Sequence, residues 1–463
     1  MRTSESEPGR LARRVFDETV EAFEPGCAVR RAVRVVGDGL KIFDDEFDLS
    51  ARGPGVYSVA IGKAAGAMAA ALDEILGARL AGGIVSAPPL ASRLTGRWRA
   101  FEGGHPLPNA ASLAAGRTCF DLLRRADEEG ALVVFLVSGG GSAMLEWPRD
   151  EGSTTLDDLR EANRVLITCG ASIAEVNAVR RAFSALKGGG LSRLAPRAAQ
   201  VTLIVSDTRA GEEHAVASGP TLAPPARSSG EPDAREIVER YQLAALLPTS
   251  ILQTVERHWR DEAAEGGPQA AGGRAGPLRR HHVLLDNAGA VRRAADIARS
   301  QGCAVEVAED IADQHVAEGA PLLVSRLLGL RERVGDAGVV CVVSGGEFSC
   351  PARGGGAGGR NSETALRCAL ELEARVNAES PSKRPRFVVF SAGTDGVDGN
   401  SPAAGALCDE TTARRARALG RDPQKFLDAS DAYNLFDALG DAVLTGPTGT
   451  NVRDLRILVT GER

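Results

Sequence analysis

Four times along this chain, a continuous hydrophobic run ends abruptly at a short loop of glycine and other small residues. Runs of this kind, rich in β-branched and aromatic residues, are typical of strands buried on both faces of a parallel sheet. Ligands of α/β proteins bind where loops leave the carboxyl ends of such strands, so these loops predict a binding site. A fifth small, polar loop lies near the C-terminus. The five segments are VYSVAIGKAAG at 56–66, LVVFLVSGGGS at 132–142, VVCVVSGGEF at 339–348, FVVFSAGTDG at 387–396 and LTGPTGTN at 444–451.

Segments with helical periodicity separate the hydrophobic runs, and this alternation predicts an α/β fold with a mostly parallel sheet. In the N-terminal segment 11–39, the hydrophobic positions indicate helices that break at Pro25-Gly26. The predicted strands are 56–61, 81–88, 131–137, 201–207, 282–286, 304–308 and 456–461. The predicted helices are 63–76, 112–128, 156–168, 172–186, 288–300 and 315–330.

The length of 463 residues predicts two or three domains. Residues 261–280, DEAAEGGPQAAGGRAGPLRR, are rich in glycine, alanine and proline, which is typical of a linker or a long surface loop. We therefore expect an N-terminal domain at 1–260 and a C-terminal domain at 281–463.

Composition and charge argue against several classes of function. The net charge of −6 gives no general attraction to nucleic acid or to an anionic membrane. The chain shows neither a signal-peptide pattern nor a hydrophobic stretch near about 18 residues, which predicts a cytoplasmic protein. Its eight cysteines form no CxxC pair and no zinc-like spacing. Only five of the 55 basic residues are lysines, so each lysine beside a glycine-rich loop is of interest.

Two loops of the N-terminal half have the composition of anion sites. Lys63 follows the strand at 56–61 and opens an alanine-rich helix, where its charge adds to the partial positive charge of a helix N-terminus. The loop Ser138-Gly139-Gly140-Gly141-Ser142 follows another buried strand, and its backbone N–H groups and hydroxyls can hold an anion. A solvated lysine and a sharp strand–helix turn are the alternatives. The chain contains no Walker A sequence.

Further polar residues follow in the N-terminal half. Asn177, Arg180 and Lys187 lie in or just after one predicted helix, and the glycines after Lys187 also fit plain helix capping. Asp207 ends the strand that begins at 201, where a carboxylate can hold Mg²⁺ or accept a hydroxyl proton, or simply cap a turn. His105 and His214 are assigned no role.

In the C-terminal half, a glycine-rich run at 354–359 leads into a helix that opens with Arg360, and arginine binds phosphate in a bidentate manner. Each of the other polar residues near the strand ends is weak evidence alone, and their occurrence together favours a site. They are Glu347, Asn361, Glu363, Thr394, Asp395, Thr448 and Asn451.

The motifs resemble, in the same order, those of the glycerate 2-kinase family, whose C-terminal part is known as the MOFRL domain. The resemblance covers about residues 10 to 460. The matching segments are AIGKAAGAM, GHPLPN, VSGGGSAML, EVNAVRRAFSALKGGGL, LIVSD with ASGPT, SGGEF with GGRNSE, SAGTDGVDG and TGPTGTNV.

The resemblance implies ATP-dependent phosphorylation of D-glycerate to 2-phosphoglycerate with a divalent metal. It implies a larger Rossmann-like domain with a mostly parallel sheet and a smaller α/β domain, with the active site in the cleft between them. Lys63 is then the candidate for substrate binding and transition-state stabilisation, and the loop 138–142 is the anion cradle. Arg360 and the Asp395 loop lie across the cleft. The catalytic residues are predicted to be Lys63, Asp207 and Arg360, and the Mg²⁺ ligands Asp207 and Asp395.

The predicted partners are D-glycerate and a nucleotide, with no nucleic acid and no membrane, and a homodimer is considered as the oligomeric state. Two alternatives remain open: an NAD(P)H-dependent hydroxypyruvate reductase, a label that some family members carry, and a non-catalytic protein that binds a sugar acid or nucleotide. A reductase should have G-x-G-x-x-G directly after a strand, and no predicted strand is followed by it. The chain departs from the family pattern at Gly355 and Ala357, where relatives usually have basic residues, at Ser362 and at 208–213. These departures concern nucleotide affinity and the choice of phosphoryl donor.

Overall fold

The computed structural model describes residues 3–49, 55–223, 232–264, 277–335, 338–376 and 386–461. The chain divides into two compact units. The N-terminal unit is Pro25–Leu284, and the C-terminal unit combines Leu285–Arg463 with Met1–Glu24. Most of the predicted linker at 261–280 lies outside the described residues.

The N-terminal unit contains a six-stranded sheet with the order β6-β5-β4-β7-β8-β9. The pairs formed by β6, β5, β4, β7 and β8 are all parallel, as the hydrophobic runs predict. β4 and β7, the two central strands, are buried along their whole length. The strands are β4 (Val56–Ile61), β5 (Leu80–Ala87), β6 (Trp98–Glu102), β7 (Leu132–Ser138), β8 (Ala199–Val205) and β9 (Arg279–Leu285).

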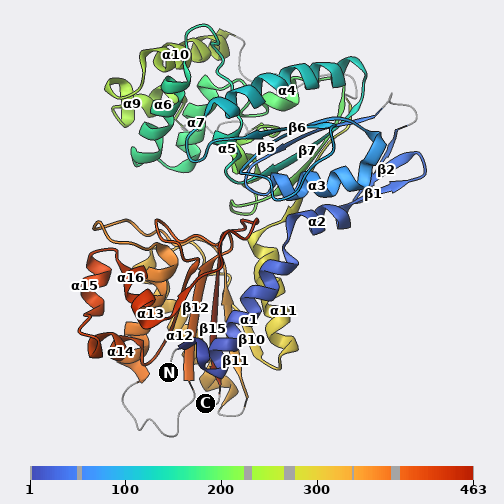
Figure 1. Cartoon of the computed structure of the whole chain (residues 1–463). Coiled ribbons are helices and arrows are strands. Elements are labelled where there is room, and N and C mark those ends of the chain that lie inside the picture. Colours follow the sequence, from blue (N-terminus) through green and yellow to red (C-terminus); the bar gives the residue numbers. More distant parts are fainter. Residues whose placement is uncertain are drawn as a thin grey trace. The chain divides into compact units, whose positions relative to one another are not determined.

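Helices pack around this sheet, with α4 on one side and α3 on the other (Figure 1). Every second residue of β4 and β7 joins α4 in one hydrophobic core, while α6, α7, α9 and α10 build a second core of their own. The helices are α2 (Pro25–Ala32), α3 (Ala65–Leu76), α4 (Ala110–Glu128), α5 (Gly141–Met144), α6 (Leu156–Thr168), α7 (Ile173–Phe183), α8 (Gly190–Arg193), α9 (Ala234–Arg240) and α10 (Thr249–Ala264). The segment after α2 forms a small antiparallel sheet, β1 (Val33–Val36), β2 (Gly39–Ile42) and β3 (Asp45–Asp48), where the sequence predicts helix.

The C-terminal unit has a second six-stranded sheet, with the order β10-β11-β15-β12-β13-β14. It is mixed, because the last strand of the chain, β15, lies between β11 and β12 and runs antiparallel to both. The carboxyl ends of β11 and β12 therefore meet the start of β15 at one edge. The strands are β10 (Ala304–Val307), β11 (Val340–Ser344), β12 (Arg386–Gly393), β13 (Gly405–Asp409), β14 (Ala442–Val443) and β15 (Asp454–Gly461).

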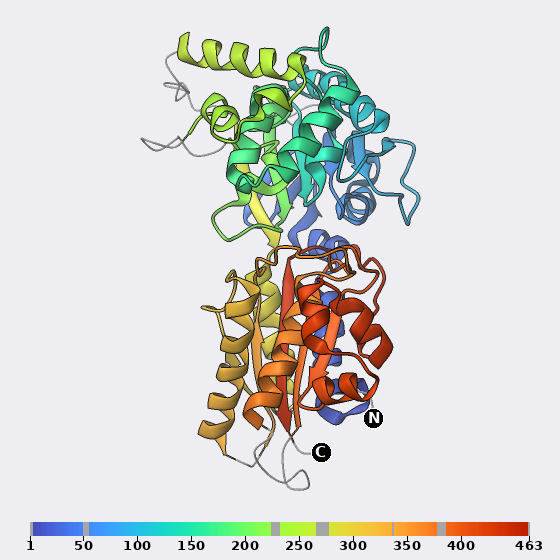
Figure 2. The same ribbon diagram turned by 90° about the vertical axis from the view of Figure 1, so that its left-hand side faces the viewer.

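Helices cover both faces of this second sheet (Figures 1 and 2). α12 and α13 pack on one face within a large hydrophobic core, and α1 and α11 pack on the other. The helices are α1 (Glu7–Ala22), α11 (Asn287–Ser300), α12 (Val316–Val334), α13 (Arg360–Val376), α14 (Thr412–Ala418), α15 (Pro423–Asp428) and α16 (Ala432–Leu439). The predicted fold class, two α/β sheets of which the larger unit's is mostly parallel, is confirmed.

The start of the chain lies in the C-terminal unit, whereas the sequence prediction assigns it to the N-terminal domain. α1 packs on β12 and β15, and the rings of Phe16 and Phe390 lie 4.8 Å apart. Ahead of α1, Thr3 is fully buried and its N–H donates to the Asp441 carboxylate at 2.9 Å. Its hydroxyl contacts Asp441 and Asp409, and Arg415 donates to it at 2.8 Å. The predicted boundary misses this because no sequence pattern shows that the first helix packs on the sheet formed by the end of the chain.

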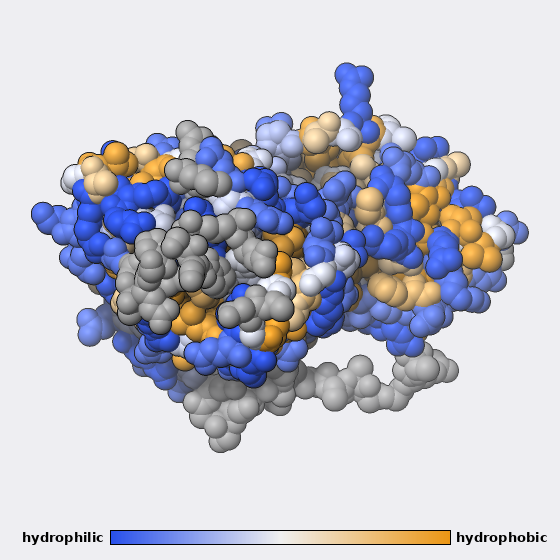
Figure 3. Space-filling model, turned by 90° about the horizontal axis from the view of Figure 1, so that it is seen from below, coloured by the Kyte–Doolittle hydropathy of each residue, from blue (hydrophilic) through white to orange (hydrophobic). Residues whose placement is uncertain are grey.

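Within the described residues, no helix is long and apolar enough to cross a membrane. On the face drawn in Figure 3, hydrophilic residues predominate and hydrophobic ones form separate patches. The cytoplasmic location stays a prediction.

We expect Thr3→Val to destabilise the C-terminal unit by ~1–3 kcal/mol, because two buried carboxylates lose a hydroxyl partner. Hydrogen exchange should become faster in β13 and β15. Thr168→Val is the matched control, since Thr168 is exposed on α6. Faster exchange confined to Pro25–Leu284 would contradict the assignment of Thr3 to the C-terminal unit.

Candidate active site

In the N-terminal unit, the loops after β4 and β7 are in direct contact. The N–H of Lys63 donates to the carbonyl of Gly139 at 2.9 Å, and the N–H of Ala64 donates to the Ser138 hydroxyl at 3.1 Å. A Cβ on Gly62, whose φ is +107°, would lie 2.3 Å from the Ser138 carbonyl oxygen. Glycine is therefore required for the two loops to approach this closely.

Three polar side chains from three strand ends surround the β7 loop. A Cβ on Gly140 would lie 3.2 Å from Cγ of Lys63 and 3.1 Å from Cδ2 of His105. A Cβ on Gly139 would lie 2.0 Å from a carboxylate oxygen of Asp207. Lys63, His105 and Asp207 thus converge on one loop, in which Gly140 has a left-handed φ of +80°. The structure brings Lys63, Asp207 and the loop 138–142 together, and it adds His105.

The two serine hydroxyls of the loop have protein partners. The Ser138 hydroxyl is buried and donates to the Ile61 carbonyl at 3.2 Å. The Ser142 hydroxyl lies 2.7 Å from that of Ser218, which donates to Oδ1 of Asn177 at 2.8 Å. Because the Ser218 proton goes to Asn177, the Ser142 proton points to Ser218. The donors that remain for an anion in this loop are therefore its backbone N–H groups. Asn177 supports the loop indirectly, through its hydrogen bond from Ser218.

Ser218 is held by an unusual backbone. Ala217, Ser218 and Gly219 have φ angles of +52°, +61° and +63°, a left-handed conformation that non-glycine residues rarely adopt. This backbone brings Ala217 under Gly141, where an added Cβ would lie 2.7 Å from that of Ala217. Local strain here supports the loop that Lys63 contacts.

Arg180 and Lys187 do not join this loop in any contact of the described residues. Lys187 is 2% exposed and forms an ion pair with Glu146, which is fully buried. Burial lowers the pKa of Lys187, and the Glu146 carboxylate opposes that shift. Arg180 is also buried and donates to Oδ1 of Asn163 at 2.9 Å. The predicted role of Lys187 as an anion ligand is corrected, because Glu146 already neutralises its charge.

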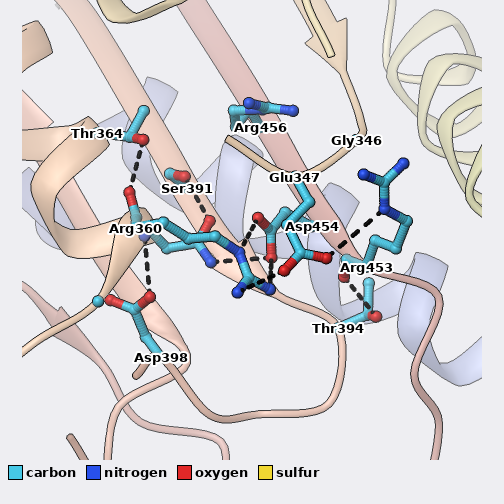
Figure 4. Close-up of polar contacts among 12 residues, drawn as sticks. Gly346, Glu347, Arg360, Thr364, Ser391, Thr394, Asp398, Arg453, Asp454 and Arg456 are labelled. Carbon is cyan, nitrogen blue, oxygen red and sulfur yellow. Dashed lines mark hydrogen bonds and ion pairs between the residues drawn. The ribbon is translucent and has the colours of Figure 1, made fainter. Parts of the chain in front are cut away.

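In the C-terminal unit, a charged cluster occupies the edge where β11, β12 and β15 meet (Figure 4). Arg360, the first residue of α13, donates to both carboxylate oxygens of Asp454 at 2.6 and 3.0 Å. The Asn361 amide donates to the same carboxylate at 3.0 Å. Asp454 is 2% exposed and Arg360 is 30% exposed, so a buried carboxylate aims an accessible guanidinium.

Glu347 and Arg453 complete the cluster. Glu347 lies 2.9 Å from Arg360 and 3.7 Å from Arg453. Burial raises the pKa of Glu347, and the two arginines oppose that shift. Arg453 has a left-handed φ of +69° and pairs with Asp313. Burial would lower the pKa of Arg360, but Asp454 and Glu347 raise it, so this arginine stays charged.

The N-terminus of α13 has its own carboxylate. Asp398 is buried, and its oxygens accept from the N–H groups of Asn361 at 2.9 Å and Ser362 at 2.8 Å. Asp398 is the cap of α13, which leaves the Arg360 side chain, and not the helix end, as the group that can bind an anion.

The remaining predicted residues support the cluster or lie apart from it. The hydroxyl and N–H of Thr394 donate to the Arg453 carbonyl at 2.7 and 2.9 Å, and Thr448 donates to the Thr394 carbonyl at 2.5 Å. Asn451 accepts from the N–H of Arg453. The Asp395 carboxylate accepts from the N–H of Val397 at 3.1 Å. Glu363 pairs with Arg367 one turn further along α13.

Several residues of both sites were not predicted from the sequence. Asp454 begins a strand, and Glu146 follows a helical turn, so neither has a motif that marks it. The sequence assigns no role to His105. The unpredicted residues are His105, Glu146, Ser218, Asn287, Asp313, Arg453 and Asp454.

No group of three His, Cys, Asp or Glu side chains in the described part of the chain could hold a metal alone. Mg²⁺ is commonly bound by one or two carboxylates together with substrate phosphates and water. Asp207 fits that pattern, because the β7 loop has glycine where a Cβ would strike its carboxylate.

Comparison with known proteins gives the family. Residues 340–454 match the MOFRL family, and residues 11–256 match a domain of unknown function, DUF4147. A glycerate 2-kinase of Pyrococcus horikoshii is 32% identical, over 97% of each chain. The chain belongs to the glycerate kinase family. The crystal structure of a glycerate kinase from Thermotoga maritima has a TM-score of 0.76 and 27% identity, over 97% of this chain and 98% of that one.

Some relatives of this glycerate kinase family member carry a different name. A protein of Agrobacterium vitis that is named as a hydroxypyruvate reductase is 34% identical, over 87% of this chain and 98% of its own. The resemblance stated from the motifs is thus confirmed, including its two kinds of name.

We expect Lys187→Met to lower the free energy of unfolding by about 3–5 kcal/mol, because Glu146 would stay buried without its partner. Urea unfolding measures the loss. Lys425→Met is the control, since Lys425 is exposed. The double variant Lys187→Met with Glu146→Gln should recover much of the stability. Normal stability of Lys187→Met with lost turnover would instead favour an anion-binding lysine.

Proposed function

We propose that this protein phosphorylates D-glycerate with ATP and releases 2-phosphoglycerate. The observation that carries the proposal is the convergence of Lys63, Asp207 and the β7 loop in a member of the glycerate kinase family. Phosphoryl transfer is mainly a matter of positioning and charge stabilisation, so it needs such charged groups and little covalent chemistry.

In this proposal, the groups of the N-terminal unit act on the phosphoryl group and on the substrate hydroxyl. Lys63 stabilises charge on the transferred phosphoryl group, and the backbone N–H groups of 139–142 orient it. Asp207, which lies against Gly139, accepts the proton of the substrate hydroxyl or carries the metal. His105 lies beside Lys63 at Gly140 and is placed to contact the same anion.

The C-terminal unit contributes Arg360 as a second anion ligand. Arginine has five N–H donors, of which Asp454 accepts two, while Glu347 forms an ion pair with the guanidinium. The guanidinium is aimed by Asp454, so little side-chain entropy is lost when an anion binds. We assign Arg360 to the carboxylate of glycerate or to a phosphate of the nucleotide.

The cofactors belong to the proposal as well. Mg²⁺ bound with ATP would neutralise the phosphate charge, and Asp207 in the N-terminal unit is the carboxylate we assign to it. Cytoplasmic location and a homodimer stay predictions from the sequence.

A reductase is the second candidate, because the Agrobacterium vitis relative is named as one. A dinucleotide fingerprint should join a strand directly to a helix. The spacing occurs here at Gly354, Gly356 and Gly359, ahead of α13, but residues 345–353 separate it from β11. This arrangement favours the kinase. A non-catalytic binding protein is the third candidate, and observed turnover of D-glycerate would exclude it.

We expect ATP, Mg²⁺ and D-glycerate to give 2-phosphoglycerate and ADP, identified by phosphorus NMR. Lys63 and the backbone N–H groups of 139–142 are placed to bind a phosphoryl group, and phosphoryl transfer needs no hydride donor. Reduction of hydroxypyruvate by NADH without ADP formation would establish the reductase instead.

We expect Lys63→Ala to lower turnover roughly a hundredfold, which corresponds to about 3 kcal/mol of transition-state stabilisation. The helix should form normally, because alanine has the highest helix propensity. Lys63→Arg should restore little, since a planar fork does not replace a compact ammonium. Steady-state assays at saturating ATP measure the effect, with thermal melts as the test of folding.

Lys41→Ala is the matched control, because Lys41 pairs with Glu46 on the small sheet. It should keep full turnover. If Lys63→Ala melts normally and keeps more than about a third of the turnover, Lys63 is a solvated lysine and not the central catalytic group.

A further inference from the structure

Two carboxylates contact Arg360, and they are held very differently. Asp454 is buried, forms two hydrogen bonds to the guanidinium and accepts a third from Asn361. Glu347 has a 40% exposed side chain and lies 2.9 Å from Arg360 in an ion pair. Its other contact, to Arg453, is 3.7 Å long. Glu347 is therefore the more easily displaced of the two.

The backbone of Glu347 is held by hydrogen bonds and close packing, separately from its side chain. The Glu347 N–H donates to Asp313 at 3.0 Å, and the Gly346 N–H donates to Asn287 at 2.7 Å. A Cβ on Gly346 would lie 2.3 Å from the Ala312 carbonyl oxygen, and its φ is +86°. Rotation of the side chain alone can thus remove the carboxylate while the loop stays in place.

We propose that Glu347 is an internal counterion that occupies the anion site of Arg360 and Arg453 and is displaced when substrate binds. Its carboxylate lies 2.9 Å from Arg360 and 3.7 Å from Arg453. Figure 4 shows it between the two arginines. The incoming group is an oxyanion, either the carboxylate of glycerate or a phosphate of the nucleotide. The inference rests on the proposed function only for the choice of these two probes.

The surroundings of Glu347 make it a suitable counterion. Arg360 on α13 and Arg453 before β15 attract it, whereas Asp454 on β15 and Asp313 before α12 carry the same charge. Burial and Asp454 raise its pKa, so the carboxyl takes up a proton more readily than an ordinary glutamate. Protonation would release both arginines, and anion binding should therefore improve as the pH falls.

The test is isothermal titration calorimetry with D-glycerate alone and with ADP alone, on the full chain. Glu347→Gln should bind at least one of them roughly threefold to fivefold more tightly, the size expected for loss of an exposed ion pair. The probe that gains affinity identifies the oxyanion. Asp454→Asn should bind the same probe more weakly, because Arg360 loses the carboxylate that aims it.

The opposite signs separate this proposal from a general effect of removing negative charge, which would tighten binding in both variants. Glu332→Gln, at an exposed position of α12, should change nothing. With D-glycerate, which stays ionised above about pH 5, wild-type affinity should rise as the pH falls and Glu347→Gln should lose this dependence.

Unchanged or weaker binding of both probes by Glu347→Gln would overturn the proposal. Failure of both probes to bind the wild type and Glu347→Gln would overturn it as well. Loss of turnover with unchanged binding would overturn it too, since Glu347 would then act on the reacting atoms. Because binding is measured without turnover, absence of 2-phosphoglycerate contradicts the proposed function alone.

Discussion

The contact between the strand-end loops of the N-terminal unit is the constraint on which its site depends. A Cβ on Gly62 would strike Ser138, and a Cβ on Gly139 would strike Asp207, so the loops can meet only where side chains are absent. Backbone hydrogen bonds from Lys63 and Ala64 then hold the β4 and β7 loops together. The position of Lys63 is consequently a property of the sheet and its glycines, and not of a flexible surface chain. A substitution at Gly62 would displace Lys63 through the backbone, whereas a substitution at Gly139 would strike the Asp207 carboxylate directly.

In the C-terminal unit, ion pairs rather than glycines fix the position of the candidate anion-binding side chain, Arg360. Its sheet places the end of β11, the end of β12 and the start of β15 at one edge, because β15 runs antiparallel between the other two. Asp454 on β15 can therefore meet Arg360 on α13, and Asp398 can cap that helix. Arg453 adopts a left-handed backbone and is fixed by Thr394, so strain is stored beside the cluster. In both units the irregular backbone lies next to the charged side chains.

The sequence predicted the strand ends well and their partners poorly. Hydrophobic runs followed by glycine mark β4, β7, β11 and β12, because burial on both faces and tight turns leave a local signal. The mixed second sheet has no such signal, since the place of β15 depends on pairing across the chain. The same holds for Thr3, which reaches Asp441 from the other end of the sequence. Lys187 shows the limit most clearly: a lysine followed by glycines looks like an anion ligand, and only its burial against Glu146 shows otherwise.

The charges of the C-terminal cluster set a condition on any ligand. Arg360, Arg453 and Arg456 face Asp313, Glu347 and Asp454, so the cluster is balanced before an anion arrives, with Asp398 committed to the helix N-terminus. Arg456 is buried against the ring of Phe348 at 3.7 Å and the Arg453 side chain is 10% exposed, which leaves Arg360, at 30%, as the most accessible cation. An oxyanion that enters a balanced cluster brings uncompensated negative charge into a partly buried place, and this is unfavourable. Two events can restore the balance: a cation can enter with the anion, or a carboxylate can leave. Arg360 and Asn361 hold Asp454, and Arg453 holds Asp313. The carboxylate able to leave is therefore that of Glu347.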